Sequence, residues 1–168
     1  MVKFLKVLDT KNPERTFGNA GIDVFVPNFS TAFMMKLLEK NPDLAAYDFE
    51  GFWVNPGQGI LIPLGLKTRF SNPNIALEAT NKSGVATKKK LLFGATLVDY
   101  SYQGEIHAHL INVGREPQKI KFGEKIIQFV PRLIDIEDHE ITEGMTKEEF
   151  YKDFESERGE GAFGSTGV

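Results

Sequence analysis

The chain has 168 residues, a formal net charge of −3 and no cysteine. This length suits one domain with its own core, and the lack of cysteine excludes disulfides, thiol nucleophiles and thiolate metal sites. The small negative charge argues against a nucleic-acid partner. Since no apolar run approaches the roughly 18 residues of a membrane span and the charged N-terminus does not suit a signal peptide, we expect a soluble intracellular protein.

Short β-rich segments separated by Gly, Pro and Asn make up most of the chain. The segments predicted as strands are 2–8, 22–26, 59–70, 75–79, 91–98, 105–111, 118–122 and 125–133. Their spacing predicts an all-β barrel or jelly roll, because the long βαβ spacings of a parallel sheet are missing. We expect a single domain over residues 1–168.

Two stretches interrupt the strand pattern. Ser30 is a candidate N-cap for apolar residues at helical spacing up to Lys40, and Asn41 with the proline after it ends the pattern. This helix lies in the segment 28–54, which we interpret as an inserted helical segment. Further on, Thr146 and Glu149 form a capping-box pattern that predicts a second, short helix.

Several polar residues are candidates for chemistry. Asp99 follows an apolar strand, a position from which a carboxylate can act as a general base or simply begin a turn. Asp23 projects from a strand face opposite its apolar neighbours, where a carboxylate is often only solvated. The stretch 81–85 places a cation, a hydroxyl and a flexible amide together, as phosphate-binding turns and ordinary turns both do. Gln128, in an apolar strand, needs a partner or a ligand.

Two groups of charged or metal-ligating residues are not interpreted as binding sites. The lysines at positions 88, 89 and 90 are interpreted as a solvated loop, because three charges in a net-acidic protein do not form a nucleic-acid surface. His107 and His109 share one face of a strand, but with only one further histidine and no cysteine a zinc site has weak support.

The chain ends in a glycine-rich stretch, 158–168, with the composition of a phosphate cradle. A dinucleotide fingerprint would have to open a helix after a strand, which this stretch cannot do with so few residues remaining. A P-loop would need a lysine where Ser165 stands.

Five stretches, taken in order, resemble the five motifs of the trimeric dUTP pyrophosphatases (dUTPases). The stretches are 20–24, 82–84, 98–104, 123–128 and 158–167. The resemblance implies a β jelly roll assembled as a homotrimer with shared active sites, over which a C-terminal arm, 156–168, folds when nucleotide is bound. It implies Mg²⁺-dependent hydrolysis of dUTP to dUMP and pyrophosphate, which limits uracil incorporation into DNA and supplies dUMP for thymidylate synthesis. The expected location is the cytoplasm of a bacterium, or of a host cell if the source is viral.

The resemblance also assigns roles around the base and sugar. Asp99 would activate the water that attacks the α-phosphorus. Tyr102 would pack on the deoxyribose and leave no room for a 2′-hydroxyl, and Phe163 would stack on the uracil ring. Asp23 would orient waters around a Mg²⁺ carried mainly by the triphosphate. The hairpin that would read the uracil edge contains Phe93, Gly94, Thr96 and Val98.

The phosphate contacts follow in the same way. Arg158, Ser165 and Thr166 would hold the β- and γ-phosphates, and Ser83 and Gln128 the rest of the chain. The implied substrate-binding set also includes Lys82, Gly84 and Gly164. Lys82 stands where the second motif usually has arginine, so a point charge replaces a bidentate fork and this contact is expected to be looser.

Two other hypotheses remain open. The dCTP deaminases share this fold but use a Glu-centred site, and release of ammonia from dCTP would identify one. Alternatively, the chain is a nucleotide-gated interaction protein whose inserted segment binds a macromolecular partner. The apolar residues that motivate this are Phe33, Met34, Leu37, Leu38, Leu44, Phe49, Phe52 and Trp53. We expect instead that these residues pack on the chain's own barrel or on a trimer neighbour, because apolar helix faces usually complete a core.

Overall fold

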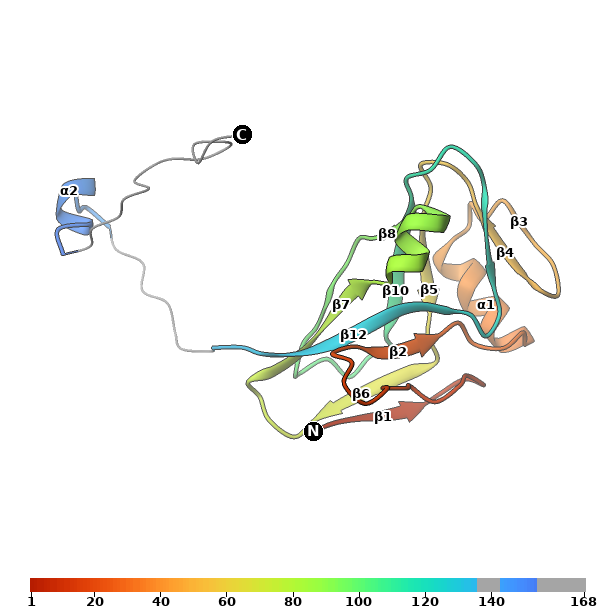
Figure 1. The fold of residues 1–168 in the computed structure, drawn as a ribbon, viewed down its shortest axis with the longest axis horizontal. Helices are drawn as coiled ribbons and strands as arrows, with labels where there is room; N and C mark the ends of the chain where they lie inside the picture. The colour runs from red at the N-terminus through yellow and green to blue at the C-terminus, as the bar shows by residue number, and fades with distance from the viewer. Residues whose placement is uncertain (136–142, 154–168) are drawn as a thin grey trace. The chain divides into compact units, whose positions relative to one another are not determined.

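The computed structural model describes residues 1–135 and 143–153 (Figure 1). By its internal contacts the chain divides into two units, Met1–Asp135 and Ile136–Val168. The described part of the second unit holds the short helix α2 (Lys147–Phe150), which begins with the predicted capping box of Thr146 and Glu149. The single domain expected over residues 1–168 stays a prediction. Among the residues described, each helix is too short or too polar to cross a membrane.

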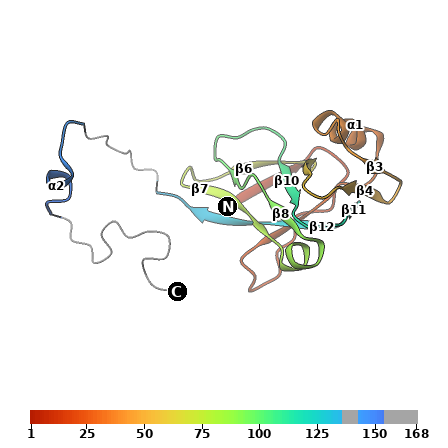
Figure 2. The same cartoon turned by 90° about the horizontal axis from the view of Figure 1, so that it is seen from above.

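Within the first unit, the strands pair in four small antiparallel sheets (Figures 1 and 2). The two-stranded sheet joins β1 (Val2–Lys6) to β6 (Leu66–Phe70). One three-stranded sheet has the order β5 (Gly59–Pro63), β10 (His107–Asn112), β8 (Leu91–Phe93). The other has the order β11 (Gln118–Lys121), β4 (Gly51–Val54), β3 (Ala46–Tyr47). The fourth sheet has the order β2 (Ile22–Phe25), β12 (Lys125–Leu133), β7 (Ile75–Asn81), β9 (Leu97–Val98).

The predicted all-β class and the eight predicted strand segments are confirmed, with three differences. The segment 59–70 is two strands, because Gly65 adopts φ +67° and turns the chain between β5 and β6. The segment 91–98 is likewise divided into β8 and β9. The inserted segment is only partly helical, since β3 and β4 follow its helix; β4 gains its ladder from β11, a partner too far along the chain for local patterns to reveal.

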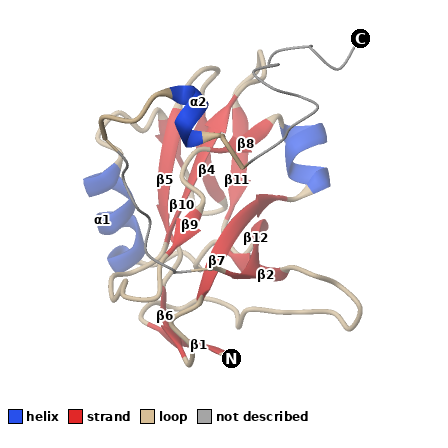
Figure 3. Ribbon diagram, turned by 90° about the vertical axis from the view of Figure 1, so that its left-hand side faces the viewer, coloured by secondary structure: helices blue, strands red, loops and turns tan. Residues whose placement is uncertain are grey.

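The inserted helix α1 (Thr31–Lys40) lies beside β5 and closes the core (Figure 3). Ser30 caps it as predicted, its Oγ accepting the N–H of Phe33 at 3.2 Å. At the other end the buried Asn41 side chain binds β5 twice, donating to the carbonyl of Leu61 at 2.8 Å and accepting its N–H at 2.8 Å. The helix is therefore fixed to the barrel at both ends.

The apolar residues of the inserted segment are mostly core residues. Phe33, Leu37 and Phe52 have no exposed surface, and the rings of Phe33 and Phe52 both pack on Phe122, with centroids 5.9 and 6.0 Å away. Phe49, in the turn between β3 and β4, is 81% exposed. The observed packing follows the second interpretation of this segment, completion of the protein's own core, rather than a free partner-binding face.

A charged cluster fastens that turn to β11. The Lys119 ammonium binds Asp48 at 2.9 Å and Glu50 at 2.8 Å, and it lies 4.5 Å from the centroid of the Trp53 ring. Its hydrogen bonds hold the pKa of both carboxyls below their ordinary values of 3.8 and 4.5. They also raise the pKa of Lys119, with the bond to Glu50 as the largest cause.

We expect Phe52→Ala to lower the free energy of unfolding by about 3–5 kcal/mol, because it removes a fully buried ring from the aromatic cluster. Phe49→Ala, the same change three residues earlier at an exposed position, should stay within about 0.5 kcal/mol of the parent. Urea unfolding at one fixed protein concentration measures both. Similar losses for the two variants would show that the segment does not pack as described.

We expect the destabilisation caused by Lys119→Met to shrink as the pH falls. Because the pKa values of Asp48 and Glu50 are lowered in the folded protein, their stabilisation is complete above the unfolded values of 3.8 and 4.5 and disappears as pH falls through the lower folded values. The difference in Tm between parent and variant should therefore be larger near pH ~7 than near pH ~3. A difference that does not change with pH would contradict the assignment.

Candidate active site

Two of the carboxylate and lysine candidates meet where β2 and β7 flank β12. Asp23 on β2 forms an ion pair through Oδ1 with Lys82, which follows the last residue of β7. Lys125, at the start of β12, lies 3.4 Å from Asp23 Oδ2 and 2.9 Å from Glu14 Oε2. The hydrogen bond to Glu14, and secondarily the one to Asp23, raises the pKa of Lys125. Asp23 is thus a partly buried carboxylate between two lysines.

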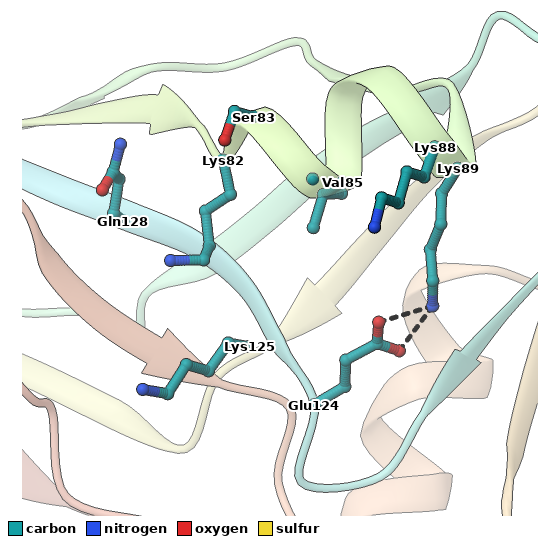
Figure 4. Close-up of a pocket in the computed structure, with 9 residues that line it drawn as sticks. Lys82, Ser83, Val85, Lys88, Lys89, Glu124, Lys125 and Gln128 are labelled. Carbon is teal, nitrogen blue, oxygen red and sulfur yellow. Dashed lines mark hydrogen bonds and ion pairs between the residues drawn. The ribbon is translucent and has the colours of Figure 1, made fainter.

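A pocket of about 410 Å³ opens beside this pair (Figure 4). Its lining residues are Lys82, Ser83, Gly84, Val85, Lys88, Lys89, Glu124, Lys125 and Gln128. Lys89 is neutralised by Glu124 at 2.5 Å, whereas Lys88 forms no ion pair with any described residue. The lining holds four lysines and one carboxylate, but Lys82 and Lys125 are paired with Asp23 and Glu14 beside it. Lys88 is thus the lining lysine whose charge no described carboxylate offsets, which suits the pocket to an anionic ligand. Four residues that the resemblance assigned to substrate binding line this pocket, namely Lys82, Ser83, Gly84 and Gln128, and their roles stay predictions.

The chain turns into this pocket because β7 ends at Asn81 and a helical turn begins at Ser83. The π-helix η1 (Val85–Lys89) follows, and it stops at Lys90, whose φ of 55° is left-handed. The loop expected for the three successive lysines is therefore wrong, because Lys88 and Lys89 lie in η1, but the expected exposure holds for Lys88 and Lys90. Lys89 is held in place by Glu124 and by the carbonyl of Lys119, 2.8 Å away, contacts that only the tertiary fold supplies.

Asn81 connects the pocket to the start of the segment 93–98, although its residue type alone suggested no role of its own. Its side-chain oxygen accepts the N–H of Phe93 at 3.1 Å, and its main-chain oxygen accepts the Gln128 amide at 3.3 Å. The available signal was its place directly before Lys82. Asn81 thereby links the main chain at Phe93 to the Gln128 amide on β12.

The segment between β8 and β9 does not form the hairpin that the resemblance implied, because β8 pairs with β10 and β9 pairs with β7. The carbonyl of Thr96 accepts the N–H of Ala79 at 2.6 Å, and Val98 pairs with Leu77. The Gly94 N–H donates to the carbonyl of His109 at 3.1 Å, and a Cβ on Gly94 would overlap the His109 ring. Gly94 is therefore required because an imidazole lies directly on its backbone.

Asp99 and Tyr102 follow β9 in the chain and are not among the residues that line the lysine pocket. The Asp99 side chain is exposed and forms no hydrogen bond with a described residue, while its carbonyl accepts the Tyr102 N–H at 3.2 Å. Asp99 directly follows β9, whose Val98 pairs with Leu77 on β7. Leu77 lies five residues before Lys82, which corresponds to about 16 Å of extended chain. Asp99 and the lysine pocket are thus separate within one copy of the chain.

The remaining predicted site residues, Arg158, Phe163, Gly164, Ser165 and Thr166, lie outside the described residues. In the part of the chain that is described, no three His, Asp or Glu side chains gather as they would around a metal ion. The carboxylate of Asp23 can contribute one outer contact, so these residues fit an ion that arrives with its ligand rather than a resident metal centre.

We expect Gly94→Ala to lower the free energy of unfolding by about 1–3 kcal/mol, because the added methyl overlaps the His109 ring. In a His109→Ala background the same change should cost much less, since the overlapping atoms are gone. Thermal or urea unfolding of the four proteins of this double-mutant cycle gives the coupling. An equal cost in both backgrounds would contradict the described contact.

Comparison with known proteins identifies the family. A family model for dUTPase matches residues 39–167. The deoxyuridine 5'-triphosphate nucleotidohydrolase of Haemophilus influenzae (strain PittEE) is 32% identical over 165 residues, and that of Mannheimia succiniciproducens is 33% identical over 168; each alignment covers 97% of this chain and 99% of the relative. A mutant dUTPase of Staphylococcus bacteriophage 80alpha, solved with dUpNHpp, has a similar fold, with TM-score 0.73, 20% identity and coverage of 100% of this chain and 99% of that one. The chain therefore belongs to the dUTPase family.

Proposed function

We propose that the chain hydrolyses dUTP to dUMP and pyrophosphate in active sites shared between copies of a homotrimer, with Asp99 activating the attacking water. Hydrolysis of dUTP rests on the family membership and on relatives named for that reaction. The shared site rests on one observation: the lysine pocket and Asp99 are separated by five residues of β7 within one copy. A site that uses both groups requires Asp99 from one copy and the pocket from another.

In this proposal the lysine pocket binds the triphosphate. Lys82 and Lys125 supply positive charge, Ser83 a hydroxyl, and the open backbone at Gly84 an N–H without a side chain in the way. Gln128 offers its amide from the neighbouring strand. Such groups act mainly by holding the phosphate chain and neutralising its charge, which is most of what phosphoryl transfer needs.

Asp23 is proposed as the protein's contact to Mg²⁺ through water. The ion would be held chiefly by the triphosphate, and it would supply neutralisation of charge on the phosphate oxygens. Asp23 is already engaged by Lys82 in this structure, so phosphate binding at Lys82 would release a carboxylate oxygen for those waters. A phage phi11 dUTPase has been solved with a structural Mg(II) ion, which supports an ion in this fold.

At the other half of the site, Asp99 would take a proton from the water that attacks the α-phosphorus, and pyrophosphate would leave. The Asp99 carboxylate is exposed and forms no hydrogen bond with a described residue, which suits it to contact a water in the site. The main chain from Phe93 to Val98 would read the uracil edge, and the Tyr102 ring would cover the deoxyribose. The C-terminal arm would close the site, with Arg158, Ser165 and Thr166 on the phosphates, Gly164 allowing close approach, and Phe163 on the base.

The alternatives are less well supported. A dCTP deaminase would need a Glu-centred site, whereas the chain matches the dUTPase family model over most of its length. The hypothesis that the inserted segment binds a partner loses the observation that suggested it, because the apolar residues concerned are largely in the core.

The first test compares pyrophosphate release from dUTP, UTP, dTTP and dCTP. We expect turnover of dUTP alone, and a large loss when the chain ends at Glu157, because the arm residues would be removed. Asp99→Asn should reduce kcat by about 10²–10⁴-fold through loss of the base. Full activity of the Asp99 variant would remove the proposed mechanism.

The shared site is tested by mixing two inactive variants, Asp99→Asn and Lys82→Met. Co-refolded mixtures should recover about a quarter of the parent activity, because random assembly pairs an intact Asp99 with an intact Lys82 at one interface in about four. If both groups served one site within a single copy, each site would lack one of them. The mixtures would then stay as inactive as the separate variants.

A further inference from the structure

We propose that Lys36, on the inserted helix α1, is a positioning residue for Tyr102 and so contributes to the choice between deoxyribose and ribose. Lys36 acts through Glu105, which joins the helix, the barrel and the loop that carries Tyr102. The inference rests on the proposed function of Tyr102 as the residue that packs on the sugar. It assigns a catalytic-site task to the inserted segment, for which the family motifs provide no role.

The Glu105 carboxylate is the centre of the arrangement. Its side chain is only 11% exposed, and its two oxygens have different partners. Oε2 lies 2.5 Å from the Lys36 ammonium, and Oε1 accepts the N–H of Gly65 at 2.9 Å. Because a largely buried carboxylate without a counter-charge is costly, loss of Lys36 would favour movement of Glu105 toward water.

The main chain of Glu105 holds the Tyr102 ring. Its carbonyl oxygen accepts the Tyr102 hydroxyl at 2.9 Å and lies 2.9 Å from Nδ1 of His107. The ring also lies directly on Gly104, where a Cβ would overlap it. Since Gly104 and Glu105 are adjacent, a displacement of the Glu105 side chain moves both supports of the ring.

Helix α1 can fix Lys36 because the helix is itself fixed. Phe33 and Leu37 are fully buried on either side of Lys36 in the sequence, and Asn41 binds the backbone of β5 at Leu61. Lys36 therefore extends from a rigid support toward Glu105, 69 residues further along the chain. Lys36 lies outside the five stretches that resemble the family motifs.

The chain offers a matched control on the same helix. Lys40 has a similar exposure, 43% against 41% for Lys36, but pairs with the exposed Glu39. We expect Lys36→Met to lower the ratio of kcat/KM for dUTP to that for UTP by about fivefold, since small misplacements of a positioning group are costly. Hydrogen–deuterium exchange in residues 99–107 should become faster. Lys40→Met should change neither quantity, and Lys36→Arg should restore both.

A double variant tests whether Lys36 acts by offsetting the charge of Glu105. Glu105→Gln keeps an oxygen for the Gly65 N–H but removes the charge, so Lys36→Met combined with Glu105→Gln should recover most of the lost ratio.

Unchanged exchange in the Lys36→Met variant overturns the inference, as does a ratio equal to that of the parent. Tyr102→Ala is the reference: if it lowers the ratio and Lys36→Met does not, the inference fails while the proposed function stands. If Tyr102→Ala leaves the ratio unchanged, the proposed role of Tyr102 fails, and the sugar-selectivity role of Lys36 fails with it.

Discussion

The place of β12 between β2 and β7 is the constraint on which the phosphate side of the site depends. Gln128 lies opposite Asp23 on one side and Thr80 on the other, so one strand register brings the amide, the carboxylate and the end of β7 together. A register shift between Lys125 and Ile127 allows Ile126 and Ile127 both to be buried while Gln128 stays accessible. A slip of one residue would exchange Gln128 with a core position and dismantle the pocket.

The inserted segment shows how an addition to a barrel becomes part of its core. Its aromatic residues pack on Phe122, Asn41 replaces a missing strand partner for Leu61, and Lys119 fastens its turn to β11. Each contact joins residues far apart in the sequence. The segment is therefore held rigidly on the barrel, and Lys36 on its helix is proposed to act through Glu105 on the loop that carries Asp99 and Tyr102.

The pocket gathers several lysines although the chain as a whole carries a small negative net charge. Asp23 and Glu124 each neutralise a lysine, while Lys88 remains without an ion pair among the described residues. Lys82 is held by Asp23 at the position where related motifs carry arginine. A lysine moves its charge more freely than an arginine held by two parallel hydrogen bonds, so under the proposed function the pair would open when phosphate binds.

The sequence by itself determined the all-β class, the N-cap at Ser30 and the capping box at Thr146, because these follow from local periodicity and short-range hydrogen bonds. The ordered motifs also singled out Lys82, Ser83, Gly84 and Gln128, which the fold collects in one pocket. Only the tertiary structure decided the roles of Asn81, Lys89 and Lys36, the pairing of β4 with β11, and the separation of Asp99 from the pocket. Each of these depends on partners distant along the chain, and no periodicity or local propensity encodes which distant partner a side chain or strand edge will meet.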